Sequence, residues 1–111
     1  MARAVYSILV VGDPAATAGD HDFGSPGLGF IWVIRDIVLR APADQAFACQ
    51  SAWVLDGADA VIFGVSNPLV RGNECYHWSG RQVMNPADTL IFRCFNNGWS
   101  VRISGYKLST P

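Results

Sequence analysis

Glycine and proline interrupt this sequence too often for long helices to form. Seventeen of the 111 residues are Gly or Pro, eleven of the first and six of the second. Val, Ile, Thr and aromatic residues dominate the segments between them, and these residues favour strands. The apolar positions nowhere keep a helical period of 3.6 residues over about a dozen residues. The spacing of the breaks therefore predicts an all-β chain.

Seven or eight strands are expected, separated by turn signals such as Asp56-Gly57, Ser79-Gly80 and Asn97-Gly98. A chain of this length has room for one hydrophobic core, so we expect one domain over residues 1–111. The predicted fold is an antiparallel β-sandwich, jelly-roll-like, without internal repeats. The expected strands are 4–11, 30–39, 46–55, 60–65, 74–78, 81–84, 89–95 and 100–108.

The strand predicted over 30–39 is apolar on both faces, with only Arg35 and Asp36 as charged residues. A strand that is covered on one side alternates apolar with polar residues. This one is therefore expected to need cover from a second sheet on one side and from something else on the other. Its two predicted faces are Phe30, Trp32, Ile34, Asp36 and Val38, and Ile31, Val33, Arg35, Ile37 and Leu39.

Residues 12–29 are expected to form a long irregular loop, since they hold five Gly, two Pro and three Asp. Loops of this length are usually functional or mobile. This one also carries Phe23, whose burial is worth about 1.5–3 kcal/mol. We expect the loop to act as an arm that packs on a neighbouring subunit. The alternative is a loop that folds back over its own sheet edge.

The charge balance excludes two classes of partner. Eight Lys and Arg against nine Asp and Glu give a net charge of −1. We therefore expect neither nucleic acid nor a membrane surface as partner.

The apolar runs are shorter than the roughly 20 residues of a membrane span, and the first residues lack a signal-peptide pattern. Cys49, Cys75 and Cys94 have no metal-site spacing, which favours free buried thiols and synthesis in a reducing cytoplasm.

Titratable residues are too sparse to predict an active site. Cys75 and His77 share a strand face, but no orienting group or oxyanion hole accompanies them. The run Asp20-His21-Asp22 contains metal-ligand types without a second cluster. We therefore predict no catalytic residues, metal or cofactor, and no enzymatic activity. A cupin-like metalloenzyme is a weaker alternative, because a cupin needs clustered His and carboxylate ligands.

The aromatic residues have two interpretations. In the first, Trp32 and Trp53 belong to the core, and Trp78 and Trp99 lie partly in an interface. In the second, Tyr76, Trp78 and Trp99 are exposed together and stack on sugars, which would make the chain a carbohydrate-binding module.

Three segments carry a resemblance to a known family. Residues 77–90, HWSGRQVMNPADTL, follow the pattern W-x-G-R-Q-V-x-N-P-G-D/E-T-L, with Ala87 at the position of the family's Gly. The closing VRISGYKL of 101–108 and the WVIRDI of 32–37 are similar to two further strands of the same family. In these segments the chain resembles small virion-associated structural proteins of tailed phages that infect actinobacteria.

The resemblance implies a non-enzymatic virion component, synthesised in the host cytoplasm. We expect a capsid decoration or minor capsid protein that assembles as a homo-oligomer and contacts other virion proteins such as the major capsid protein. A collar or tail subunit is the alternative. Arg81 is expected to anchor its turn through backbone carbonyls or Asp88. The candidate interface residues are Phe23, Trp32, Trp78, Arg81 and Trp99.

Overall fold

Eight strands make up the regular structure in the computed structural model, which describes residues 6–42, 51–56, 60–66, 74–95 and 97–109. No helix occurs in these ranges, so none of the described residues belongs to a helix that could cross a membrane. The strands are β1 (Tyr6–Ala16), β2 (Gly19–Asp22), β3 (Phe30–Arg40), β4 (Ser51–Leu55), β5 (Val61–Ser66), β6 (Cys75–Met84), β7 (Ile91–Cys94) and β8 (Trp99–Ser109).

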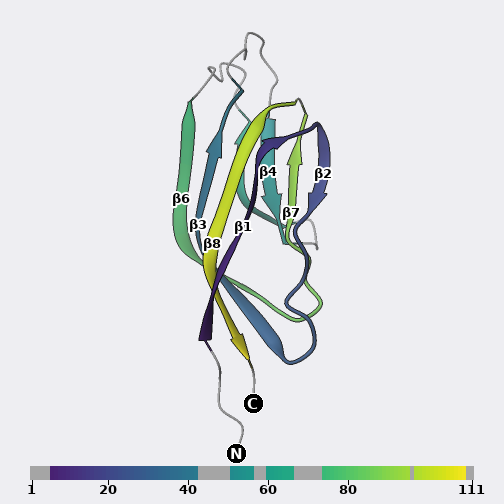
Figure 1. Cartoon of the computed structure of the whole chain (residues 1–111), viewed down its shortest axis with the longest axis vertical. Helices are drawn as coiled ribbons and strands as arrows, with labels where there is room; N and C mark the ends of the chain where they lie inside the picture. The colour runs from purple at the N-terminus through teal and green to yellow at the C-terminus, as the bar shows by residue number, and fades with distance from the viewer. Residues whose placement is uncertain (1–5, 43–50, 57–59, 67–73, 96, 110–111) are drawn as a thin grey trace, which may run out of the picture.

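The strands form two antiparallel sheets that pack face to face (Figure 1). The first sheet has the order β1-β8-β3-β6 and the second β2-β7-β4-β5. Apart from the β4–β5 hairpin, each strand crosses to the other sheet from the one before it, and the first strand pairs with the last. This is the strand order of a jelly roll made of two Greek keys. The predicted all-β, jelly-roll-like sandwich is thereby confirmed.

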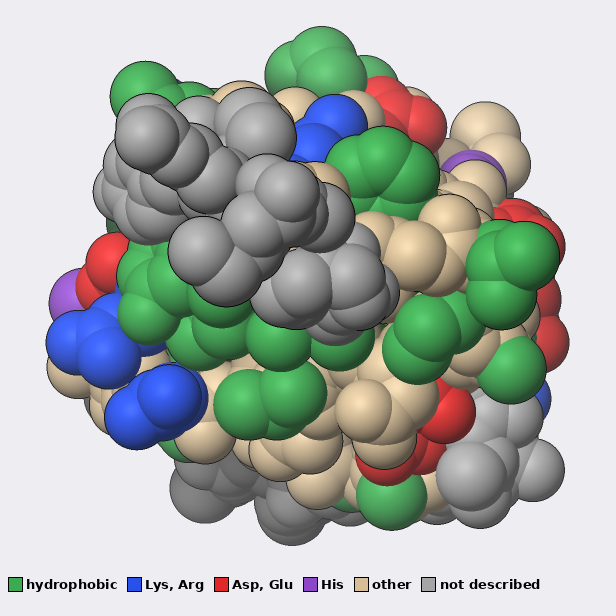
Figure 2. All heavy atoms as spheres, turned by 90° about the horizontal axis from the view of Figure 1, so that it is seen from below, with side chains coloured by type: hydrophobic (Ala, Val, Ile, Leu, Met, Phe, Trp, Pro, Cys, Tyr) green, Lys and Arg blue, Asp and Glu red, His purple; other side chains and the backbone are tan. Residues whose placement is uncertain are grey.

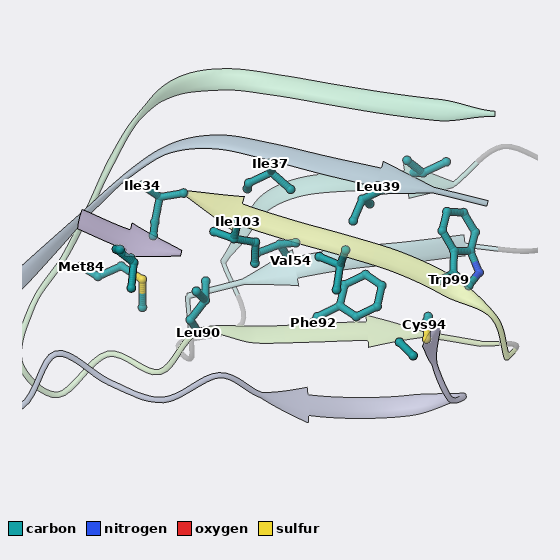
Figure 3. Close-up of a cluster of buried hydrophobic side chains, with 14 of the residues drawn as sticks. Ile34, Ile37, Leu39, Val54, Met84, Leu90, Phe92, Cys94, Trp99 and Ile103 are labelled. Carbon is teal, nitrogen blue, oxygen red and sulfur yellow. The ribbon is translucent and has the colours of Figure 1, made fainter. Parts of the chain in front are cut away.

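The core lies between the sheets, where alternate residues of the strands point inward (Figure 3). Trp99 and Phe92 are the largest of its fully buried side chains and come from opposite sheets. Both strands that carry them have polar or charged residues at intervening positions, which the outer faces accommodate. Further fully buried core residues are Leu9, Ile34, Ile37, Leu39, Val54, Met84, Leu90, Cys94 and Ile103.

A β-bulge at Arg35 changes which face of β3 points inward. The register of β3 against β8 shifts between Ile34 and Asp36, because β8 has no residue opposite Arg35. Trp32 and Ile34 point to the core before the bulge, and Ile37 and Leu39 after it. The two apolar faces predicted for this strand are therefore wrong as continuous faces. The core contains residues from both predicted faces. Ile37 and Leu39 are therefore buried between the two sheets, and no further layer is needed to cover them.

The long loop predicted over 12–29 is also wrong. β1 continues to Ala16, which is fully buried, and β2 occupies Gly19–Asp22. β2 is a short polar strand at the edge of the second sheet, where polar side chains can stay in solvent. Only 17–18 and 23–29 lie outside strands, and the longer segment begins with a hydrogen bond from the Phe23 amide to the Leu90 carbonyl, 2.8 Å long. The segment therefore closes over its own sheet.

The turn predicted at Ser79-Gly80 is absent, because β6 runs without a break from Cys75 to Met84. Gly80 lies under the ring of Trp78, with only 2.7 Å between the nearest ring carbon and the place where a Cβ would stand. The glycine makes room for the indole inside a strand instead of ending one. A turn instead follows β6 at 85–88, with the Asp88 amide donating to the Asn85 carbonyl. Residues 46–50 of the predicted strand 46–55 lie outside the described ranges.

Candidate assembly interface

Apolar side chains lie on the outer face of the first sheet. Toward the edges of this face, no other described part of the chain covers them. Ile8, Tyr106, Val33 and Val83 are neighbours across the four strands in a single line of register. We call these four residues the apolar row. Val33 at its centre is only 1% exposed, whereas Ile8 at one end is 72% exposed. The row is thus well packed in the middle and open to solvent at its ends.

Val10 widens this apolar surface on the edge strand β1, where it is 51% exposed. Next to it lies a shallow hollow of about 300 Å³, formed by residues 10–14 and 100–102. Gly12 in its wall admits no side chain, because a Cβ there would overlap the Val101 carbonyl oxygen. A long edge strand with exposed aliphatic residues is a surface that favours pairing with another chain.

Cationic side chains lie on one side of the apolar row. Arg35, Arg81 and Arg102 are exposed on strands of the first sheet. Between them His77 contacts Asp36, with 3.0 Å between Nε2 and Oδ1, and both side chains are about half exposed. In Figure 2, the Lys and Arg side chains gather mainly on one flank and most of the Asp and Glu on the other.

The outer face of the second sheet has its own aromatic pair. Trp53 and Phe95 meet edge to face, with ring centroids 5.1 Å apart and an interplanar angle of 86°. The indole of Trp53 lies over Gly64, where the missing side chain leaves it room. Phe95 is more than half exposed, as is Val61 on β5. This face therefore presents an apolar surface of its own.

The charge on this second face is acidic along β2. Arg93 on β7 donates from Nε and Nη2 to the two carboxylate oxygens of Asp20, at 2.7 and 3.2 Å. These hydrogen bonds hold the pKa of Asp20 below its usual value of 3.8, against a smaller opposing effect of desolvation. Asp22 lies on the same side of β2 and accepts a hydrogen bond from the Gly24 amide at 2.7 Å.

Two of the five predicted interface residues belong to the core. Trp99 is fully buried between the sheets, and Trp32 is buried at the opposite end of the same core. The prediction that they lie in an interface is wrong, because Trp32 shares the inner face of β3 with Ile34, and Trp99 shares that of β8 with Ile103. Phe23 and Trp78 are half-buried and pack against the core of their own chain.

Arg81, the fifth predicted residue, is exposed on β6 and does not anchor its turn. Asp88 instead accepts a hydrogen bond from the Asn85 amide at 2.9 Å, so the turn is closed by its own residues. In the described ranges Arg81 has no hydrogen bond or ion pair, which leaves its guanidinium available to a partner.

The aromatic platform expected for sugar stacking does not form. Trp99 is in the core, and Tyr76 and Trp78 are partly buried against it. Tyr76 also donates a hydrogen bond to Glu74 at 2.7 Å, and burial followed by this carboxylate raises the pKa of Tyr76 to about 12. The interpretation as a carbohydrate-binding module through these three residues is therefore wrong.

The residues considered for metal binding point to different partners. His21 contacts the Thr17 carbonyl oxygen through Nε2 at 2.6 Å, while Asp20 pairs with Arg93 and Asp22 caps Gly24. Among the described residues, no three His, Cys, Asp or Glu side chains come close enough to hold an ion. His77 is oriented by Asp36, and no hydrogen bond joins it to Cys75 in this part of the chain. Cys49 lies outside the described ranges.

Sequence reasoning missed the residues of the apolar row. Residues 4–11 read as an apolar strand, and nothing in a local pattern says which of its alternate residues face the core. Leu9 and Val11 face it, so Ile8 and Val10 face outward. The pairing of β1 with β8, about 95 residues later in the chain, decides this.

The sequence matches no protein-family model and no curated protein. Among solved structures, a chain of the Bacillus endospore appendages, a family of disulfide-linked pili, is 8% identical with a TM-score of 0.52, over 97% of this chain and 89% of that one. This likeness shows a shared fold. The core of Drosophila NLP is 17% identical with a TM-score of 0.48, over 90% and 96% of the two chains. A protein of the infectious bursal disease virus particle is 11% identical with a TM-score of 0.43, over 95% of this chain and 31% of that one.

Proposed function

We propose that this chain is a non-enzymatic structural component of a tailed-phage virion, of the capsid decoration or minor capsid type, which assembles with copies of itself. Its further partners would be other virion proteins such as the major capsid protein. It would be synthesised in the host cytoplasm and end in the particle. A subunit of the collar or tail is the alternative position.

The observation that carries this proposal is the outward-facing apolar row with Val10 beside it. Ile8 and Val10 place most of their aliphatic surface in water on a regular strand. Burying such a side chain fully is worth about 1.5–3 kcal/mol, so covering both contributes several kcal/mol to an association. Because Val33 at the centre is tightly packed, this surface is already ordered before binding. Less conformational entropy is then lost on association.

The resemblance to phage proteins supports the same surface. Its three segments, 32–37, 77–90 and 101–108, fall largely on β3, β6 and β8, which are adjacent in the first sheet. Segments far apart in the sequence thus meet in one sheet, and Val83 and Tyr106 of the apolar row belong to them. Three of the four residues of the apolar row therefore lie in the segments that carry the resemblance, while the most exposed one, Ile8, lies outside them.

The self-association is tested by light scattering on the purified full chain. We expect a particle mass that is a multiple of 12.0 kDa at micromolar concentration. Replacing Ile8 and Val10 together by Lys is expected to give the 12.0 kDa monomer with the same far-ultraviolet circular dichroism. Leu28→Lys is the matched control, since Leu28 is 96% exposed in 23–29 and outside the apolar row. A monomeric wild-type chain would contradict the proposal.

The place in the virion is tested by mass spectrometry of density-purified particles of the phage that encodes the chain. Peptides of this chain in tail-less heads support the capsid position, and peptides confined to tails support the alternative. Absence from both fractions, with the chain present in the lysate, would overturn the assignment to a virion.

A further inference from the structure

We propose that copies of this chain associate head to tail, with the outer face of the first sheet of one copy on the outer face of the second sheet of the next. This inference rests on the self-association proposed above and specifies its geometry. The apolar row of one copy is thus covered by a second copy of the chain, which contributes its second sheet and not its own apolar row.

Opposite charges on the two sheets favour this arrangement. The outer face of the first sheet carries four exposed arginines against Asp36, with Glu74 one residue before β6. The strands of the second sheet carry Arg93 against two carboxylates, and two more lie in the flanking turns. The outward-facing arginines of the first sheet are Arg35, Arg40, Arg81 and Arg102, and the acidic residues beside the second are Asp20, Asp22, Asp56 and Asp88.

A two-fold contact through either face is disfavoured by the same charges. An isologous interface places one patch against itself, so Arg81 and Arg102 would approach their counterparts on the other copy. Like charges brought together in an interface cost free energy, whereas a heterologous contact brings them near Asp20 and Asp22. Electrostatic complementarity of this kind fixes orientation and raises the association rate.

Both faces also have apolar side chains to bury. The first offers Ile8, Val10 and Val83, and the second offers Phe95, held edge to face against Trp53, with Val61 nearby. The strands of the second sheet are only four to six residues long. At a strand spacing of about 4.8 Å and a rise of about 3.3 Å per residue, that face measures about 300 Å². Two faces of this size bury about 600 Å² in total, which is below the 1,200–2,000 Å² of stable specific interfaces. The contact is therefore expected to be weak and to depend strongly on its charges.

Two double variants test the geometry, one for each face. Arg81→Glu with Arg102→Glu reverses the charge of the first face, and Val61→Lys with Phe95→Lys makes the second face cationic. All four side chains are exposed, so folding is expected to persist and is checked by circular dichroism. Each double variant alone is expected to be a 12.0 kDa monomer, because each lacks one of the two complementary faces.

Mixing the two double variants is expected to restore assembly, since each supplies the face that the other lacks. Light scattering should then show a mass of at least two chains, and analytical ultracentrifugation should show it weakening at high salt, because salt screens exposed charges. Continued assembly of the Val61/Phe95 variant alone would show a two-fold contact through the first sheet and overturn the inference. A mixture that stays monomeric would also overturn it. A monomeric wild-type chain would instead contradict the proposed function, so the two failures are distinguishable.

Discussion

Gly105 on β8 lies so close to Val33 on β3 that a methyl group on its α-carbon would overlap the Val33 carbonyl oxygen. Gly105 pairs with Ile34 directly before the bulge at Arg35, where the register of the two strands shifts. The absence of a side chain at this point lets β3 and β8 stay paired on both sides of the bulge. Since the bulge decides which residues of β3 enter the core, this glycine is expected to be essential to the fold.

Gly105→Ala is therefore expected to destabilise the chain by about 1–3 kcal/mol, because backbone atoms have to separate to admit the methyl group. For a domain of this size that lowers Tm by about 4–8 °C for each kcal/mol. Thermal unfolding followed by circular dichroism measures the change. Ser104→Ala is the neighbouring control and should stay within about 0.5 kcal/mol of wild type. A Gly105→Ala variant as stable as this control would contradict the close approach.

Trp99→Ala is expected to cost about 3–5 kcal/mol, since the ring is fully buried between the sheets and leaves a large cavity. Urea unfolding of the two proteins measures the difference. Leu28→Ala is the matched comparison for an exposed apolar residue and should change the unfolding free energy by about 0.5 kcal/mol or less. If Trp99→Ala unfolds at the same urea concentration as wild type, the indole is not a core residue.

The strand pattern could be predicted from the sequence, but the inward-facing residues of β3 could not. Alternation along 30–39 assigns Ile34 and Ile37 to opposite faces, yet both are fully buried in the same core. One extra residue at Arg35 reverses the phase, and its position depends on the register of β3 against β8. Local periodicity does not contain that register.

The edge strand β2 was missed for a different reason. Gly19–Asp22 has no apolar residue, so it lacks the alternation by which strands are recognised. It forms because β7 offers it backbone hydrogen-bonding partners, and because the Asp20–Arg93 ion pair lies across the two strands. For the candidate interface, Arg81 was the one predicted residue that is fully outward-facing. The apolar row needed the pairing of all four strands before it could be seen.

The two described thiols are expected to differ in reactivity. Cys75 is exposed on β6, whereas Cys94 is buried and donates to the Thr17 carbonyl oxygen. Burial raises the pKa of the Cys94 thiol to about 11, so little thiolate is present near neutral pH. With Ellman's reagent at pH 8, Cys75→Ser is expected to lose one equivalent of fast-reacting thiol, and Cys94→Ser none. Loss of the fast equivalent in Cys94→Ser, with the fold intact, would contradict the burial of that thiol.

The ion pair between Asp20 and Arg93 is expected to stabilise the chain only above acidic pH. Because Arg93 lowers the pKa of Asp20 below 3.8, the folded state holds this proton less tightly than the unfolded state. The stabilisation is therefore fully present above the unfolded value and is lost as the pH falls through the lower folded value. Both side chains are partly exposed, so its size should be about 1 kcal/mol or less.

Asp20→Asn provides the measurement, since the amide oxygen can still accept a hydrogen bond from Arg93 while the charge is gone. The wild-type chain is expected to have the higher Tm at pH 7, and the difference should shrink as the pH falls toward 3 and below. Arg93→Gln is the matched background: there, Asp20→Asn should leave Tm nearly unchanged at either pH. A difference between wild type and Asp20→Asn that grows on acidification would show that the carboxylate is destabilising in the folded state, and would contradict the pairing with Arg93.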